Sequence, residues 1–216
     1  NSFFVNVIGR GYPSPNIRFR WCTERMKIDP TSRYIERVVN KSGEVIILLG
    51  ARKSESATRA QVMENHAIEG SILRRHSTLP RCLVFTPIEN FTTDDVWEYL
   101  LEHPSPWGGD NRALFDLYKK AEGGECPLVI DQTTPSCGNS RFGCWVCTVV
   151  EHDKAMQGFI DSGEHNLEPL LKFRGFLKEI RSNRDLRERV RKNGQLINQD
   201  GADVWGPFTL EARKTI

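Results

Sequence analysis

Four of the six cysteines of this chain lie close together, at Cys126, Cys137, Cys144 and Cys147. The last two are separated by two residues, a spacing at which one turn directs two thiolates toward the same ion. Four thiolates complete a tetrahedral zinc site or hold a 4Fe-4S cluster, and the spacing is compatible with both. Thiols that stay free or form a disulfide are a third interpretation. Of the three, we expect the iron-sulfur cluster, with these four cysteines as its ligands.

A second group of candidate residues follows an apolar run that is typical of a strand, Val45 to Leu49. The segment after this run carries Arg52, Lys53, Glu55, Ser56 and Arg59, of which the three cations are candidate phosphate ligands. The end of a strand that leads into a helix is where α/β sheets bind ligands, and arginines there bind phosphate oxygens. We therefore predict a phosphate site, in which Glu55 orients an arginine or a magnesium ion. The alternative is an ordinary helix start with exposed salt bridges.

Cys22 stands apart from the cysteine cluster, in a basic segment that runs from Arg18 to Lys27. Cationic neighbours favour the thiolate form, so Cys22 is a candidate reactive or substrate-contacting residue. Packing as a small apolar residue beside Trp21 is equally compatible with the sequence. Cys82 has apolar neighbours, and we expect it to be buried.

The elements that must position these residues alternate between strand and helix. Residues 44–49 and 83–85 are continuous in apolar residues, as buried parallel strands are. Residues 33–40 are predicted to form a helix that stops at Gly43, and a second helix should follow a Thr or Asp cap within residues 92–95. This alternation predicts an α/β fold. The first residues of the chain also resemble a strand.

The second half of the chain has a different composition, with a loop-rich part followed by a helical pattern. Loops are expected from residue 103 through residue 148, and a helical pattern follows residue 151 and continues through Leu186 and Val190. Residues 172–192 are strongly basic, and Arg181, Arg184, Arg187 and Arg191 would form a stripe if this helix were continuous. Such a stripe can follow a DNA backbone, although a solvated helix face is the alternative.

Composition excludes little beyond a membrane protein. The chain has 216 residues, with 30 Lys and Arg against 28 Asp and Glu, so net charge alone indicates neither nucleic acid nor membrane. No apolar run reaches the roughly 18 to 20 residues of a membrane span, and the start lacks the pattern of a signal peptide. We expect a cytoplasmic protein without a membrane partner.

Several of these motifs together resemble a known group. Arg20 to Thr23 with Lys27, Gly50 to Arg59, and Pro87 to Tyr99 are similar to the adenosine-nucleotide α-hydrolases, which include phosphoadenylyl sulfate reductases. Within that group, Gly9 to Pro13, Cys126-Pro127 and Cys137 to Thr148 resemble the DndC family of DNA phosphorothioation proteins. The resemblance runs from about residue 9 to the end of the chain.

The resemblance implies a Rossmann-like ATP pyrophosphatase that helps to replace a non-bridging oxygen of a DNA phosphate with sulfur. It implies a 4Fe-4S cluster, ATP and magnesium as cofactors. It also implies double-stranded DNA, a cysteine desulfurase as sulfur donor and other phosphorothioation subunits as partners. On this basis we expect Cys22 and Lys27 to be catalytic, and Arg52, Glu55, Ser56 and Arg59 to bind the nucleotide.

One departure from the family is serious, because its Ser-x-Gly-x-Asp-Ser phosphate loop is absent. The chain also begins without Met, so we expect a fragment with an incomplete ATP site. Two other functions stay open. A phosphoadenylyl or adenylyl sulfate reductase usually relies on a C-terminal cysteine, and none follows Cys147 here. A non-catalytic iron-sulfur module for DNA binding or assembly would need no phosphate loop.

The predicted organisation has three parts. Residues 1–103 would be the C-terminal part of the nucleotide-binding α/β domain, residues 104–150 the cysteine-rich cluster segment, and residues 151–216 a helical C-terminal lobe.

Overall fold

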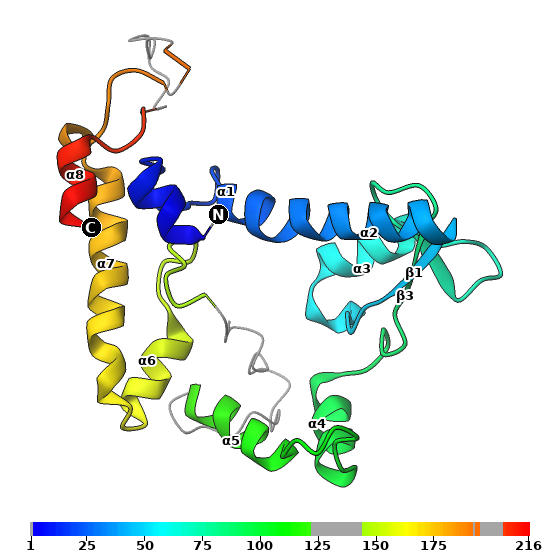
Figure 1. Ribbon diagram of the computed structural model, residues 1–216. Coiled ribbons are helices and arrows are strands. Elements are labelled where there is room, and N and C mark those ends of the chain that lie inside the picture. The colour runs from blue at the N-terminus through cyan, green and yellow to red at the C-terminus, as the bar shows by residue number, and fades with distance from the viewer. Residues whose placement is uncertain (1, 122–143, 192, 195–204) are drawn as a thin grey trace.

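The computed structural model describes residues 2–121, 144–191, 193–194 and 205–216. Its architecture is mixed α/β, with one small sheet and several helices (Figure 1). The long helix α2 (Asp29–Ser42) extends from the region where the two termini lie to the sheet. The α/β class is therefore confirmed.

Three strands form the sheet, in the order β1-β3-β2. β1 (Val45–Leu48) and β3 (Cys82–Phe85) are parallel, with Val45 opposite Cys82. These are the two strands that the apolar runs predict. β2 (Leu73–Arg75) pairs with β3 in the antiparallel direction and was not predicted. Because β1 and β3 are parallel, their carboxyl ends meet at the same edge of the sheet.

Helix α2 covers one face of this sheet. Ile35 and Val39 of the helix pack with Cys82, and Val45 and Ile47 of β1 lie against this cluster. The helix ends where predicted, at Gly43, whose φ of 85° suits glycine and whose N–H donates to the carbonyl of Val39 (2.7 Å).

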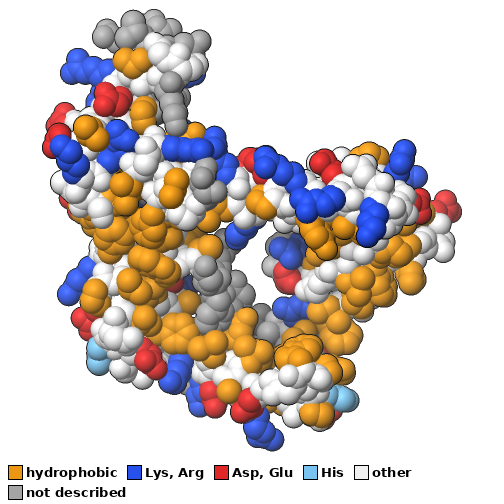
Figure 2. All heavy atoms as spheres, in the orientation of Figure 1, with side chains coloured by type: hydrophobic (Ala, Val, Ile, Leu, Met, Phe, Trp, Pro, Cys, Tyr) orange, Lys and Arg blue, Asp and Glu red, His pale blue; other side chains and the backbone are white. Residues whose placement is uncertain are grey.

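The second face of β1 differs from the prediction of a buried strand. Ile46 and Leu48 are 51% and 69% exposed, because alternate side chains of a strand point to opposite faces and α2 covers the face of Val45 and Ile47. Figure 2 shows hydrophobic side chains gathered over this part of the molecule. The continuous apolar run therefore identified the strand correctly but overestimated its burial.

Helices α3 (Ala57–Asn65) and α4 (Thr93–Glu102) follow β1 and β3. The predicted cap of α4 is confirmed: Thr92 Oγ1 accepts the Asp95 N–H (3.1 Å), and the Asp95 carboxylate accepts the Thr92 N–H (2.7 Å). The two bonds together form a capping box.

The prediction of loops from residue 103 was wrong for α5 (Asn111–Ala121). Asp110 Oδ1 accepts the N–H groups of Arg112 and Ala113 and so starts this helix. Phe115 and Tyr118 then pack their rings edge-on against the buried Trp97 of α4.

The C-terminal lobe consists of short helices around one long one. It comprises α6 (Lys154–Asp161), the turn η4 (His165–Leu167), α7 (Glu168–Ser182), the turn η5 (Arg184–Leu186) and α8 (Leu210–Thr215). The prediction that the helix continues through Leu186 and Val190 was wrong. Asn183 is extended and its side chain accepts the Asp185 N–H (3.0 Å), which ends α7 and starts a tighter turn.

The start of the chain is helical, so the prediction of a strand there was also wrong. The π-helical turn η1 (Val5–Gly9) places Val7 in a core with Trp21, Leu177, Ile180 and Phe208. Helix α1 (Trp21–Thr23) and the π-helical segment η2 (Glu24–Ile28) lead from this core into α2. This core joins the first residues of the chain to the C-terminal lobe. The division into residues 1–103, 104–150 and 151–216 stays a prediction.

Within the described residues, no helix has both the length and the apolar character that crossing a membrane requires.

Candidate functional site

The carboxyl ends of β1 and β3 bring two segments into direct contact. The N–H of Lys53, after β1, donates to the carbonyl of Glu89, after β3 (2.8 Å). Ser54 Oγ donates to the carbonyl of Phe91 (2.9 Å). The segment with the predicted phosphate ligands is therefore fixed at the edge where parallel sheets bind ligands.

Arg52 and Arg59 share one carboxylate at this edge. Glu55 lies 2.7 Å from Arg59 Nη1 and 3.6 Å from Arg52 Nε. Arg52 also donates to Thr93 Oγ1 (3.3 Å), which links the end of β1 to the first turn of α4. Glu55 thus orients both arginines, whereas the sequence predicted that it would orient a single arginine or a magnesium ion. A phosphate group can compete with the Glu55 carboxylate for the two guanidinium groups.

Ser56 has a local role in the described structure. Its hydroxyl accepts the Arg59 N–H (3.1 Å) and caps α3 (Ala57–Asn65). An N-cap serine satisfies a backbone donor at the start of a helix. The cap therefore sets the direction in which α3 carries Arg59 away from the strand.

A second charged network at the same edge joins Lys53, a predicted phosphate ligand, to three residues that the sequence analysis missed, Glu64, Arg74 and Glu89. Arg74 of β2 forms an ion pair with Glu89 and donates to Thr86 Oγ1 (2.8 Å). Lys53 lies 2.7 Å from a carboxylate oxygen of Glu64 and 3.8 Å from one of Glu89. Glu89 could have been found from its position just after a parallel strand, but Arg74 belongs to a strand with no clear pattern.

Together the two networks place four cations against three carboxylates. The cations are Arg52, Lys53, Arg59 and Arg74, and the carboxylates are Glu55, Glu64 and Glu89. The hydrogen bond between Lys53 and Glu64 raises the pKa of the lysine and lowers the pKa of the carboxyl. Asp95, whose carboxylate also interacts with Arg52, adds a fourth carboxylate, so cations and carboxylates balance at this edge.

The two predicted catalytic residues lie on other elements. Cys22, in α1, is half-buried against the core that contains Trp21, and Lys27 is exposed on η2. Among the residues that the structure describes, no hydrogen bond or ion pair joins either of them to the segment from Arg52 to Arg59. Their catalytic roles stay a prediction.

The predicted cluster ligands are described only in part. Cys126 and Cys137 lie outside the described residues. Cys144 and Cys147 are free thiols, the first exposed and the second half-buried, and the Cys147 N–H donates to the Cys144 carbonyl (2.7 Å). This turn fits a pair of thiolate ligands for a metal centre. In the described ranges no three potential ligands gather.

Cys82 behaves as predicted. It is 2% exposed in β3, and burial raises the pKa of its thiol. A buried thiol of this kind packs as a small apolar residue.

The predicted arginine stripe does not form, because α7 ends at Ser182 and two of the four arginines point inward. Arg181 donates to the carbonyl of Thr148 (3.0 Å). Arg187 donates to the carbonyls of Trp205 and Gly206, and its burial lowers the pKa of its guanidinium to about 10. Arg184 and Arg191 remain exposed.

The sequence of this chain matches the phosphoadenosine phosphosulfate reductase domain over residues 10–150, more than half of its length. The chain belongs to this family. The matched range includes the sheet, the charged edge and the turn with Cys144 and Cys147, so family membership covers the whole candidate site.

A relative from Methanocaldococcus jannaschii, described as an uncharacterized protein, is 27% identical over 150 residues. The aligned region is 69% of this chain and 24% of that protein. The chain thus spans about a quarter of the length of this relative. No solved structure matches the chain.

Proposed function

We propose that the chain is the ATP pyrophosphatase component of a DNA phosphorothioate modification system. The observation that carries the proposal is the pair Arg52 and Arg59, held by one carboxylate at the carboxyl end of a parallel strand. The family membership supports chemistry on an adenosine nucleotide. The motifs around the cysteines, which resemble the DndC family, support DNA as the acceptor.

The proposed reaction has two steps. An oxygen of a DNA phosphate attacks the α-phosphorus of ATP, a new P–O bond forms, and pyrophosphate leaves. A sulfur nucleophile then forms a P–S bond to the DNA phosphorus, and AMP leaves with the displaced oxygen. Both steps gain most from positioning and from cations near the developing charge.

The residues of the chain have definite tasks in this scheme. Arg52 and Arg59 would exchange Glu55 for phosphate oxygens, and magnesium would accompany the ATP. Ser56 would keep the first turn of α3 in place. Cys22 and Lys27 remain the proposed catalytic residues on the separate segment formed by α1 and η2.

A 4Fe-4S cluster on Cys126, Cys137, Cys144 and Cys147 is part of the proposal. The turn formed by the two described cysteines supports it. When bound, the cluster would organise this segment and supply redox-active iron and sulfide. A cysteine desulfurase would supply the sulfur as a persulfide, and a thiol reductant would provide the two electrons that bring it to the sulfide level of the phosphorothioate. Other subunits of the modification system would be partners.

Release of pyrophosphate from ATP by the complete protein, with and without double-stranded DNA, tests the proposal. Arg52→Ala and Arg59→Ala should each abolish most of the release. Arg52→Lys should also impair it, because lysine cannot make a bidentate contact with phosphate. Arg37→Ala is the matched control, since Arg37 is exposed on α2 away from the sheet edge. Wild-type rates in both alanine variants would remove these arginines from the site.

A reductase is the second candidate, because the matching family is named for that activity. It would act on a sulfated nucleotide and release sulfite, without DNA. Sulfite release from phosphoadenylyl sulfate, together with pyrophosphate release that does not respond to DNA, would favour the reductase over the modification enzyme.

A further inference from the structure

The helix α7 carries a buried arginine, Arg174, which is only 4% exposed. Its Nε donates to the carbonyl of Cys147 (2.8 Å), and its Nη2 donates to the carbonyl of Val150 (2.6 Å). The carbonyl of Glu151 lies at 3.4 Å from Nη2. One guanidinium thus holds the backbone at Cys147 and the residues that follow it.

A second set of bonds fixes the same segment to α7 and to the N-terminal part of the chain. Arg181, two turns further along α7, donates to the carbonyls of Thr148 (3.0 Å) and Pro15 (2.5 Å). The buried hydroxyl of Thr148 also donates to the Pro15 carbonyl (2.7 Å). The backbone that leaves Cys147 is therefore tied to α7 and to the N-terminal segment at the same time.

The hydrogen bonds of Arg174 all go to backbone carbonyls, and the Glu151 carboxylate, which pairs with Lys178, interacts with its charge only from a greater distance. In the part of the chain that the structure describes, no carboxylate lies within ion-pair distance of this guanidinium. Burial of a cation without an anionic partner is costly. A negatively charged group beside Cys147 would offset that cost, and a centre bound by four thiolates carries net negative charge.

We propose that Arg174 is the positioning residue for the cluster ligand Cys147. It holds the Cys147 backbone against α7 before the metal binds, and its charge offsets that of the thiolates afterwards. This inference rests on the proposed function in one respect, namely that the cysteines bind a metal cluster. The hydrogen-bonding part concerns the protein alone.

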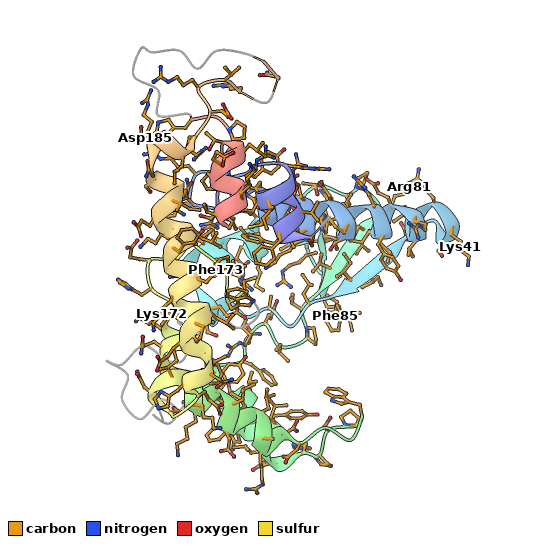
Figure 3. All side chains as sticks on the ribbon, turned by 60° about the vertical axis from the view of Figure 1, so that its left-hand side comes forward. Lys41, Arg81, Phe85, Lys172, Phe173 and Asp185 are labelled. Carbon is orange, nitrogen blue, oxygen red and sulfur yellow. The ribbon has the colours of Figure 1, made fainter. Side chains whose placement is uncertain are left out.

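Three variants of the full chain separate the two roles of Arg174. Arg174→Gln removes the charge and most of the hydrogen bonds. Arg174→Lys keeps the charge, but a single ammonium group cannot reproduce the planar fork. Lys172→Gln is the matched control, because Lys172 is an exposed cation on the same helix (Figure 3).

The first measurement is the rate at which anaerobically reconstituted protein loses its iron to a chelator. Groups that orient metal ligands typically contribute 10- to 100-fold in metal affinity. We expect Arg174→Gln to lose iron at least about tenfold faster than the wild type, with Arg174→Lys between them and Lys172→Gln unchanged. A wild-type rate in Arg174→Gln overturns the inference.

The reduction potential distinguishes a charge effect from a damaged fold. Loss of a nearby cation disfavours the more negative, reduced cluster, so Arg174→Gln should have a lower potential than Arg174→Lys. A tenfold shift in the one-electron equilibrium corresponds to 59 mV. Equal potentials in the two variants would overturn the electrostatic role.

Amide hydrogen exchange of the metal-free chain tests whether Arg174 holds the Cys147 backbone, independently of whether a cluster binds. Arg174→Gln should speed exchange of the Cys147 to Glu151 amides while α2 keeps its protection, which shows that the fold is intact. Unchanged exchange in this segment overturns the positioning role. A wild-type chain that takes up no iron contradicts the proposed cofactor instead, whatever the exchange result.

Discussion

Arginines serve two different purposes in the two halves of this molecule. At the sheet edge, Arg52 and Arg59 pair with a carboxylate, and the Arg59 side chain is 48% exposed. In the C-terminal lobe, Arg174 and Arg187 donate to backbone carbonyls of neighbouring segments. An arginine paired with a side-chain carboxylate can exchange it for phosphate, whereas an arginine bound to backbone carbonyls holds the fold.

This difference corrects a conclusion that local sequence alone would support. The richest run of arginines, residues 172–192, is the one that predicts DNA binding, but two members of its stripe are structural. The less basic segment after β1 provides the pair that is better placed for an anionic ligand. The partners of an arginine therefore matter more than the local density of positive charge.

The largest expected effect is on stability, from Arg187→Ala. The guanidinium donates to the carbonyls of Arg181, Trp205 and Gly206, and hydrogen bonds with a charged donor are worth about 1.5 to 3 kcal/mol. We expect a loss of about 2 kcal/mol in the free energy of unfolding, measured by urea denaturation. Arg189→Ala, at an exposed position, should change it by less than about 0.5 kcal/mol. Equal effects would show that Arg187 is not structural.

The second effect concerns DNA. If the complete protein binds DNA through the exposed arginines of this lobe, replacing Arg184 and Arg191 with Gln should weaken binding. The slope of log affinity against log salt should then fall by roughly 0.9 in magnitude for each phosphate that is no longer neutralised. Binding is measured at several salt concentrations, so that weaker electrostatic attraction is distinguished from a damaged fold. Unchanged affinity and slope would place the DNA on another surface or on a partner subunit.

A smaller effect tests whether phosphate exchanges with Glu55. Exposed ion pairs are worth about 0.2 to 1 kcal/mol, so removing this competitor should strengthen binding of pyrophosphate by up to about fivefold. Calorimetric titration of Glu55→Gln measures this change, with the exposed Glu69→Gln as control. Weaker binding in Glu55→Gln would mean that the carboxylate is needed to orient the arginines in the bound state as well.

The smallest effect is a pH dependence at the start of α4. The hydrogen bond from the Thr92 N–H is the main reason that the pKa of the Asp95 carboxyl is lowered. A carboxyl whose pKa is lowered in the folded state stabilises the protein at any pH above the pKa of the unfolded chain, about 3.9. This stabilisation is lost as the pH falls through the lower pKa of the folded state.

Asp95→Asn should therefore lower the melting temperature at pH 7. The melting temperature of this variant should also decrease less than that of the wild type when the pH is lowered from 5 to about 3. Glu98→Gln, on an exposed position of the same helix, is the control. Parallel pH profiles for Asp95→Asn and the wild type would show that the cap contributes no measurable pH dependence.

Local patterns were sufficient for several elements of the fold. The apolar runs identified β1 and β3, and Gly43 and Thr92 marked a helix end and a helix start because their conformations and side chains satisfy the backbone nearby. Cys82 was correctly placed in the core by its neighbours. These signals work because each depends on residues within a few positions of one another.

The errors had two sources. The start of the chain was misassigned because Val7 packs in one core with Phe208, which lies near the opposite end of the chain, and periodicity does not record such a contact. The end of α7 and the start of α5 were missed although Asn183 and Asp110 mark them, because a single side-chain cap is a weaker signal than an apolar or basic pattern that continues past it.

The sequence by itself determined the mixed α/β class, the parallel strand pair and the membership of a nucleotide-handling family. Only the tertiary structure decided which cations face a ligand and which hold the backbone. The side chains of Arg52 and Arg174 are chemically identical, and their roles differ because one meets a carboxylate at an open edge and the other meets carbonyls in a closed core. That choice depends on segments that meet only when the chain has folded.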